Sequence, residues 1–169
     1  MTEPGFTVRP ARTSDVPAIK ALVEPLVQSR ILLGKETVVF YEAVQEFRVA
    51  EDAGGRLIGC GALHVMWEDL AEVRTLAVEE GWLRRGVGHA ILDRLEQRAE
   101  RLGIHRLFCL TFEVDFFIKH GFEQMSEEPM DPELYAELVR SADEGVAEFL
   151  DLSRVKANTL GNTRMLKNL

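Results

Sequence analysis

The hydrophobic pattern that organises the chain runs from Ala71 to Leu102. Its first part, AEVRTLAV, is rich in Val, Leu, Thr and Ala, and this composition predicts a mostly buried strand over 71–78. Its last part, GVGHAILDRLEQRAERL, sets apolar residues at helical spacing with charged residues between them. This spacing predicts an amphipathic helix of about four turns. Its expected inward positions are Ala90, Ile91, Leu95, Ala99 and Leu102.

Shorter apolar runs predict the remaining elements. Strands are expected at 8–12, 46–51, 56–66, 107–111 and 164–166, with another after Gly121. Helices are expected at 16–26, 37–43 and 132–141, while 145–152 is ambiguous. Pro25 should bend or end the first helix, because proline lacks the N–H that a helix interior needs. The run at 107–111 is almost continuously apolar, so it should be an interior strand.

Composition and charge bound the class of protein. A chain of 169 residues with 46% hydrophobic content is expected to form one domain, spanning 1–169. The net charge of −8 argues against general binding to nucleic acid or anionic membranes, although it leaves room for a local basic pocket. Neither a signal segment nor a membrane-length apolar run is present in the sequence. Cys60 and Cys109 lack metal-ligand spacing, so we expect buried free thiols, no metal and a cytoplasmic location.

The segment between the predicted central strand and helix carries the candidate chemistry. Arg84-Arg85-Gly86-Val87-Gly88 lies at the first turn of the helix, where backbone N–H groups have no intrahelical acceptor. Glycines let a ligand approach that backbone closely, so the turn is a candidate phosphate site. Each hydrogen bond to a charged group contributes about 1.5–3 kcal/mol, so several amides together outweigh a helix dipole worth about 0.3–1 kcal/mol.

The local pattern at this turn has three alternative interpretations. A tight strand-to-helix turn without a ligand explains Gly86 and Gly88 equally well on the local pattern alone. A dinucleotide-binding fingerprint is disfavoured because Ile91 stands where its third glycine belongs. A P-loop is disfavoured because no Gly-Lys-Ser/Thr follows.

The wider arrangement of motifs resembles the GNAT acetyltransferase superfamily. The family signature Q/R-x-x-G-x-G/A, which holds the pyrophosphate of acetyl-CoA, falls on 83–88, with Leu83 in place of Gln or Arg. The later signature F-Y-x-x-x-G-F appears as Phe116-Phe117 followed by Gly121-Phe122. The resemblance covers most of the chain and implies an α/β, three-layer fold. Its mixed central sheet would hold about six or seven strands, flanked by helices.

A narrower likeness lies within that superfamily. The segments ILLGK, EFRVAE, LIGCGAL, AEVRTLAV and LFCLTFE resemble the acetyltransferase domain of bacterial N-acetylglutamate synthases. EAVQEFRVAE and FLDLSRVKANTLGNTRML are similar to the short, stand-alone actinobacterial type. The resemblance implies transfer of the acetyl group of acetyl-CoA to the α-amine of L-glutamate, or of L-glutamine, at the first step of arginine biosynthesis. It is compatible with a homodimer.

The resemblance also implies roles for particular residues. Glu72 matches the proposed general base, acting through water because a carboxylate near pKa ~4.3 is a weak base; the alternative is an exposed strand-end glutamate. Thr111 matches a hydroxyl that could assist the leaving thiolate, since Phe117 replaces the usual tyrosine; filling a strand end is an equal alternative. Expected coenzyme-binding residues are Leu76, Ala77, Val78, Arg84, Arg85, Gly86, Val87, Gly88 and His89, the last also suiting a surface or capping role.

A substrate with two carboxylates needs cations in its pocket. Lys35 is the first candidate from the ILLGK match, followed by Arg74 and Arg164, with a solvated surface charge as the alternative for each. Backbone N–H groups near Thr75 and Leu76 are the family's usual donors to the thioester oxygen.

One departure weakens the substrate assignment. Phe112-Glu113-Val114 stands where related synthases carry T-R-S, which would lower the affinity for glutamate or favour glutamine. Two further interpretations stay open: a GNAT enzyme acting on another amine or a protein N-terminus, and a CoA-binding sensor without catalysis.

Overall fold

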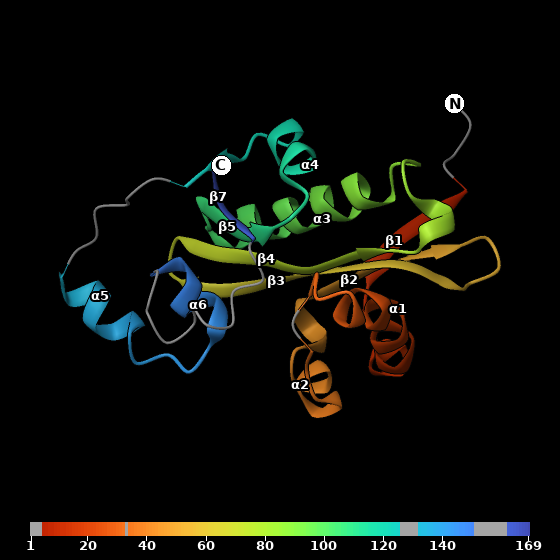
Figure 1. Ribbon diagram of the computed structural model, residues 1–169, viewed down its shortest axis with the longest axis horizontal. Coiled ribbons are helices and arrows are strands. Elements are labelled where there is room, and N and C mark those ends of the chain that lie inside the picture. Colours follow the sequence, from red (N-terminus) through yellow and green to blue (C-terminus); the bar gives the residue numbers. More distant parts are fainter. Residues whose placement is uncertain (1–4, 33, 126–131, 151–161) are drawn as a thin grey trace. The chain divides into compact units, whose positions relative to one another are not determined.

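The computed structural model describes residues 5–32, 34–125, 132–150 and 162–169. Its seven-stranded sheet has the order β1-β2-β3-β4-β5-β7-β6 (Figure 1). The strands are β1 (Phe6–Pro10), β2 (Phe47–Asp52), β3 (Leu57–Trp67), β4 (Leu70–Val78), β5 (Arg106–Thr111), β6 (Glu123–Gln124) and β7 (Thr163–Asn168). The β4–β5 pair is parallel, whereas β1–β2, β2–β3, β5–β7 and β6–β7 are antiparallel. The sheet is therefore mixed, which confirms the predicted fold class.

Six helices accompany the described strands. They are α1 (Val16–Gln28), α2 (Thr37–Glu42), α3 (Val87–Leu102), α4 (Val114–Lys119), α5 (Pro132–Leu138) and α6 (Glu144–Phe149). Short 3-10 turns are η1 (Thr13–Asp15), η2 (Val44–Glu46) and η3 (Glu80–Trp82). No helix in the described part of the chain is long and apolar enough to cross a membrane.

The chain divides into two compact units. The first unit comprises Met1–His64 and Val73–Leu102, and the second comprises Val65–Glu72 and Gly103–Leu169. Each unit contains part of β3 and part of β4, because both strands continue from one into the other. That the whole chain is one domain stays a prediction, and the two units are described in turn.

In the first unit, helices cover both faces of the strands. Figure 1 shows α1 and α2 on one face and α3 on the other. The face towards α1 is built on buried residues that include Ile19, Phe40, Phe47 and Val49. The α3 face is closely packed, since a Cβ at Gly61 would lie 2.9 Å from Ile91 and 3.0 Å from Leu76.

Two sequence predictions differ from the structure in this unit: α1 does not end at Pro25, whereas a bend there stays a prediction, and Leu102 is not buried. Pro25 lies inside α1, which continues to Gln28, and the N–H of Ser29 bonds the carbonyl of Pro25 at 3.1 Å. Pro25 is exposed and near the helix end, so water can hydrate the carbonyl that proline leaves without a donor. Leu102 is 48% exposed although its spacing predicts burial, because it is the last residue of α3. Buried Leu92 takes part in the apolar face instead.

The second unit is built around β5 and β7. They pair along their full length, from Arg106↔Asn168 to Thr111↔Thr163, and β7 also pairs with β6. The final strand of the chain therefore lies inside the sheet order. Phe108 of β5 meets Phe149 of α6 edge to face, with ring centroids 5.5 Å apart, in the core of this unit.

The C-terminal helices differ from expectation in extent. The helix predicted over 132–141 ends at Leu138, and Val139 lies beyond it with 39% of its surface exposed. The ambiguous stretch at 145–152 is helical as α6 up to Phe149, because Asp143 caps it by accepting the N–H of Val146 at 3.0 Å. Residues 151 and 152 lie outside the described part of the chain.

Candidate active site

The turn that precedes α3 presents its backbone openly. Gly86 has φ +86° and its carbonyl accepts the N–H of Ala90 at 3.0 Å, so α3 begins directly after it. No atom lies within 4 Å of the place where a Cβ would be on Gly86. The next N–H groups belong to the first turn of the helix, where the helix itself provides no acceptor. Backbone donors therefore line an open surface, as an anion site requires.

The two arginines of the turn are held differently. The guanidinium of Arg85 lies 4.0 Å from the ring centroid of Trp82, a cation–π contact that fixes its position. Trp82 in turn meets Phe6 edge to face, with centroids 6.2 Å apart. Arg84 is exposed and has φ +62°, which few residues other than glycine adopt. The role of Trp82 was not predicted, because its partner Phe6 is distant in sequence.

The strand that leads to this turn, β4, contains a left-handed residue at Thr75. Thr75 has φ +56° and only 9% exposure, and its carbonyl accepts a hydrogen bond from the thiol of Cys60 at 3.4 Å. A left-handed residue inside a strand re-aims the backbone groups beside it, here those of Leu76. Ala77 is buried, while Leu76 and Val78 are half-buried. Sequence pattern missed this conformation, because threonine is an ordinary strand residue.

Glu72 is a buried carboxylate in the second unit. It is 7% exposed, which makes the alternative of an exposed strand-end glutamate wrong. The pairing of β4 with β5 ends at Glu72, which lies opposite Phe108. Beyond this pair, β5 continues to Thr111. Burial, and then the nearby charge of Glu72, raise the pKa of the Cys109 thiol well above its usual value. The Glu72 side chain is thus almost completely shielded from solvent.

Thr111 closes the turn after β5. Its Oγ1 accepts the backbone N–H of Glu113 at 2.8 Å, and the residue is 9% exposed. In this bond the hydroxyl is only an acceptor, so it can still donate a hydrogen bond to another group. Phe117 is 4% exposed and packs edge to face on Phe122, with centroids 5.0 Å apart. The position that bears tyrosine in many relatives is therefore a core position in this chain.

The predicted substrate cations differ in their surroundings. Lys35, in the segment before α2, and Arg74, on β4, are both half-buried and both interact with other groups in the molecule. In the second unit, Arg164 of β7 donates from its guanidinium to the carbonyl of Phe149. Its Nε is buried and, in the described part of the chain, has no hydrogen-bond partner. His89, in the first turn of α3, is half-buried and also has an interaction within the molecule.

The structure therefore distributes the predicted residues over both units. The first unit brings together the coenzyme candidates 76–78 and 84–89, and it also contains Lys35, Arg74 and Thr75. The second unit contains Glu72, Thr111 and Arg164. Both thiols are free and buried, and burial raises the pKa of Cys60 to about 12. Among the described residues, no group of His, Cys, Asp and Glu could hold a metal ion.

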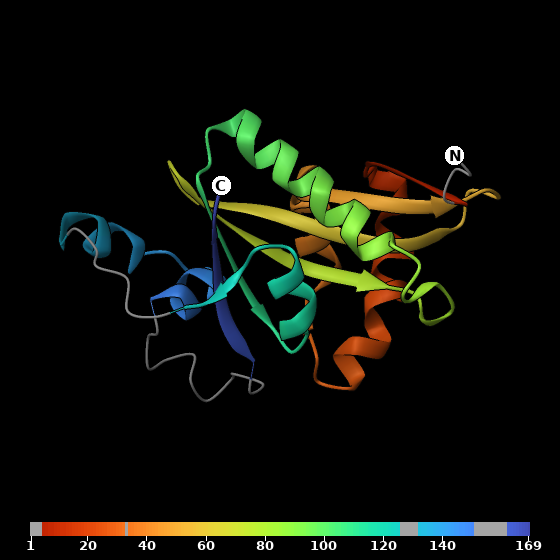
Figure 2. The same ribbon diagram turned by 90° about the horizontal axis from the view of Figure 1, so that it is seen from above.

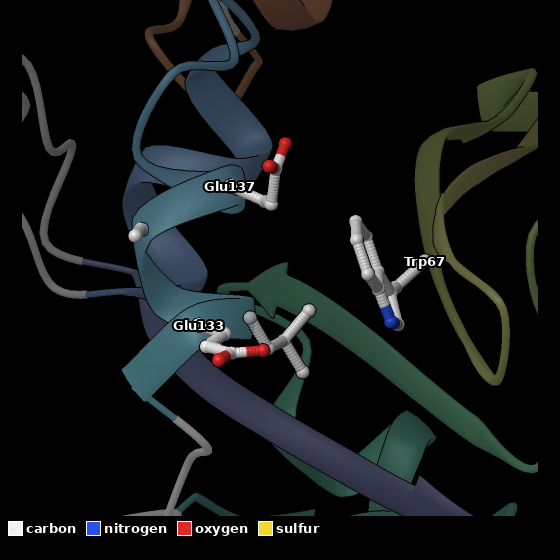
Figure 3. A pocket seen from close by; sticks show the side chains of 5 residues that line it. Trp67, Glu133 and Glu137 are labelled. Atoms are coloured by element: carbon white, nitrogen blue, oxygen red, sulfur yellow. The ribbon is translucent and has the colours of Figure 1, made fainter.

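A pocket of about 520 Å³ in the second unit is separate from these candidates. It is lined by Trp67, Glu133, Leu134, Ala136 and Glu137. Figure 3 shows the Trp67 ring opposite α5, with the side chains of Glu133 and Glu137 on the helix. Glu137 also pairs with Arg140 at 3.3 Å. No predicted site residue lines this pocket.

Comparison with known proteins adds a family pattern and close relatives. The pattern of the acetyltransferase (GNAT) family matches residues 26–122. An amino-acid acetyltransferase of Mycobacterium tuberculosis is 57% identical over 161 residues, which are 94% of this chain and 92% of the relative. An amino-acid acetyltransferase of Neisseria meningitidis is 34% identical over 126 residues, and the chain spans 29% of its length.

Solved structures agree with the sequence relatives. Rv2747 from Mycobacterium tuberculosis, crystallised in complex with CoA and NLQ, superposes with a TM-score of 0.91 and 56% identity, covering 96% of this chain and 99% of that one. N-acetylglutamate synthase from Neisseria gonorrhoeae, complexed with coenzyme A and N-acetyl-glutamate, gives a TM-score of 0.77 at 25% identity. That match covers 97% of this chain and 35% of the synthase.

Proposed function

The chain belongs to the GNAT acetyltransferase family, and from this premise we propose that it acetylates the α-amine of L-glutamate, or of L-glutamine, with acetyl-CoA. The family membership makes it an acyltransferase. With L-glutamate as the acceptor, the reaction would supply N-acetylglutamate at the first step of arginine biosynthesis. We also propose a cytoplasmic location, which the two free, buried cysteines support. A homodimer stays a prediction.

One observation carries the proposal. The 57% identity to an amino-acid acetyltransferase extends over 94% of this chain and 92% of the relative, so it is not limited to a shared coenzyme motif. A likeness limited to the coenzyme turn would leave the acceptor undetermined. The crystallised synthase that holds coenzyme A with N-acetyl-glutamate supports the same acceptor class.

The proposed coenzyme site uses the backbone of the first unit. Gly86, Val87 and Gly88 would donate N–H groups to the pyrophosphate, with Arg84, Arg85 and His89 beside them. The re-aimed strand at Leu76–Val78 would pair with the pantetheine arm. An N–H near Thr75 or Leu76 would stabilise the oxyanion that forms on the thioester carbonyl.

The proposed chemistry begins with a proton. The substrate ammonium must lose one before its nitrogen attacks the thioester carbonyl, and Glu72 would accept it, directly or through a water. The C–S bond then breaks, coenzyme A leaves as a thiolate, and the new amide nitrogen loses its second proton to water. With a thiol pKa of about 8.5, leaving in this form at pH 7 costs about 2 kcal/mol. The Thr111 hydroxyl would reduce that cost by donating a hydrogen bond.

Substrate recognition would rest on the cations. Lys35 is proposed for a carboxylate of the amino acid, with Arg74 and Arg164 as further candidates. The buried Nε of Arg164 supports its candidacy, because a buried donor without an acceptor is costly unless a ligand provides one.

The test is thiol release on mixing the protein with acetyl-CoA and single amino acids. Release with glutamate or glutamine, and acetylation of the α-amine in the product, is the expected result. Release only with polyamines, other small amines or peptide N-termini would contradict the acceptor assignment. Binding of CoA without release on any amine would contradict the enzyme assignment.

A further inference from the structure

Helix α3 separates its charges into two rows. Arg94, Arg98 and Arg101 are spaced i, i+4 and i+7, so they share one side of the helix beside its buried stripe. The carboxylates Asp93, Glu96 and Glu100 fall on the other side of that stripe, since residues are about 100° apart around a helix. The first side is therefore purely cationic, although the whole chain has a net charge of −8.

A fourth arginine joins this row from the sheet. Phe47 and Val49 of β2 belong to the core beneath α1, so Arg48 between them points to the opposite face, which α3 covers (Figure 1). Arg48 is half-buried. Burial, and then the charges of Arg98, Arg101 and Arg94, lower its pKa. These four arginines are called the arginine patch below.

On the other face of the same strands, another half-buried arginine is paired with carboxylates. Arg9 of β1 holds Asp15 at 2.7 Å and Glu51 at 3.1 Å, and these carboxylates raise its pKa. In the described part of the chain, no carboxylate forms an ion pair with any member of the arginine patch. Arg48 donates to the carbonyl of Phe47 at 3.2 Å, which uses one of its five N–H groups. Like charges held together in this way destabilise the free protein, unless an anion compensates them.

We propose that the arginine patch binds a compact anion with several phosphate groups, such as a nucleoside triphosphate or a short inorganic polyphosphate. Guanidinium groups match phosphate oxygens with paired hydrogen bonds. The recessed position of Arg48 favours a small ligand over a flat protein surface. The net charge of −8 disfavours extended polyanions such as nucleic acids.

This site is distinct from the proposed coenzyme turn. Arg94, the nearest member of the patch in sequence, is seven positions after Val87 on α3, or roughly 10 Å along the helix axis at about 1.5 Å per residue. The patch also includes a β2 residue that no part of the proposed reaction uses. The inference goes beyond the proposed function and does not depend on the acceptor.

The test is calorimetric titration of the full chain at low salt with inorganic tripolyphosphate, and separately with ATP in the absence of magnesium. We expect dissociation constants in the micromolar range that weaken steeply with added salt. Equal affinity for tripolyphosphate and ATP would show that the patch recognises only the phosphate groups. Tighter binding of ATP would show that the nucleoside is also in contact with the protein.

Variants locate the site. Arg98→Gln should weaken tripolyphosphate binding at least fivefold, and Arg94→Gln with Arg98→Gln at least thirtyfold. Arg94 is exposed and Arg98 is half-buried beside the apolar stripe, and neither belongs to the buried residues of α3, so folding should persist; removing like charge should raise the melting temperature of the free protein. Arg140→Gln is the matched control, because it removes one exposed arginine outside the patch and should leave affinity within twofold. CoA affinity should stay unchanged in the α3 variants.

Four results would overturn the proposal. The first is that neither phosphate ligand binds to the unaltered chain, and the second is that Arg140→Gln loses as much affinity for tripolyphosphate as the α3 variants. The third is that saturating CoA displaces tripolyphosphate. The fourth is that a glutamate-rich peptide binds but tripolyphosphate does not. Displacement by CoA would show that the patch belongs to the coenzyme site.

Discussion

The turn before α3 and the buried polar residues of β4 and β5 would serve the proposed reaction in two different ways. The turn is open, and its donors belong to the backbone around Gly86. The second unit holds two buried polar side chains, Glu72 at the last β4–β5 pair and Thr111 at the end of β5, which are 7% and 9% exposed. Most side-chain substitutions leave the backbone N–H groups in place. Leu83 can therefore stand at the first position of the motif, where the family signature has Gln or Arg. Acid–base chemistry needs one particular side chain, and no neighbour can replace it.

The largest expected effect in this contrast concerns the buried polar residues. Glu72→Gln keeps the shape of the side chain but removes the proton acceptor, so turnover should fall by about 10²- to 10⁴-fold. The affinity for acetyl-CoA should change by no more than about threefold, because the proposed coenzyme contacts lie elsewhere. Steady-state kinetics and calorimetric titration of CoA measure the two effects.

Glu148→Gln is the matched control for that experiment. Glu148 is 6% exposed, in the same unit, but on α6. If both variants lose turnover equally, loss of a buried carboxylate explains the effect and Glu72 has no chemical role. Unchanged turnover in Glu72→Gln would also remove it from the mechanism.

The next effect tests the backbone side of the comparison. Gly86→Val should weaken CoA binding by about 10- to 150-fold, equivalent to the loss of one or more amide-to-phosphate hydrogen bonds worth about 1.5–3 kcal/mol. No protein atom lies within 4 Å of the new Cβ, so the loss is expected from bulk towards the ligand and from a φ of +86° that valine disfavours.

Gly55→Val separates the two causes. Gly55 lies in the β2–β3 hairpin with φ +82° and equally open surroundings. Both variants should lose about 1–2 kcal/mol of unfolding free energy, but only Gly86→Val should lose CoA affinity. Equal CoA affinity in the two would exclude the turn as the pyrophosphate site.

A smaller effect is expected at Thr111. Thr111→Val removes the acceptor of the Glu113 N–H and should lower the free energy of unfolding by about 1 kcal/mol. The loss in turnover at pH 7 should not exceed about 30-fold, because thiolate departure costs only about 2 kcal/mol there.

The pH dependence distinguishes assistance from structure. If Thr111 assists the thiolate, the deficit of Thr111→Val relative to the unaltered enzyme should shrink as pH rises from 7 to 9, where free thiols ionise without help. Thr111→Ser, which keeps the hydroxyl, should restore the rate. If the deficit in turnover of Thr111→Val does not change with pH, the role of Thr111 is limited to its structural hydrogen bond with Glu113.

Much of the regular secondary structure could be predicted from the sequence. The hairpin β2–β3 and the start of α3 follow from apolar runs, helical spacing and glycine placement, all of which are local. The mixed sheet was predicted only from the resemblance to the GNAT superfamily. Pro25 was misjudged because its cost depends on exposure and on distance from the helix end. Local spacing could not reveal that β7 lies between β5 and β6, since that order depends on pairing across the chain.

The candidate site was only partly predictable for a related reason. Motif positions such as Gly86 can be found by spacing, because the backbone requirement leaves a glycine in the sequence. The left-handed Thr75 leaves no such signal, and the Trp82 partner of Arg85 depends on packing against Phe6. Burial of Glu72 was also not visible, since a lone glutamate in a strand is more often exposed.

The smallest effect in the comparison concerns Arg85, whose side chain belongs to a site built mainly from backbone. Arg85→Ala should weaken CoA binding by only about three- to fivefold, because an exposed cation contributes about 0.5–1 kcal/mol. Arg85→Lys should keep most of the affinity at low salt, since it retains the charge but not the planar stacking on Trp82. Titration at two salt concentrations measures both variants. A loss in Arg85→Ala as large as that in Gly86→Val would mean that side chains, and not peptide N–H groups, dominate coenzyme binding at this turn.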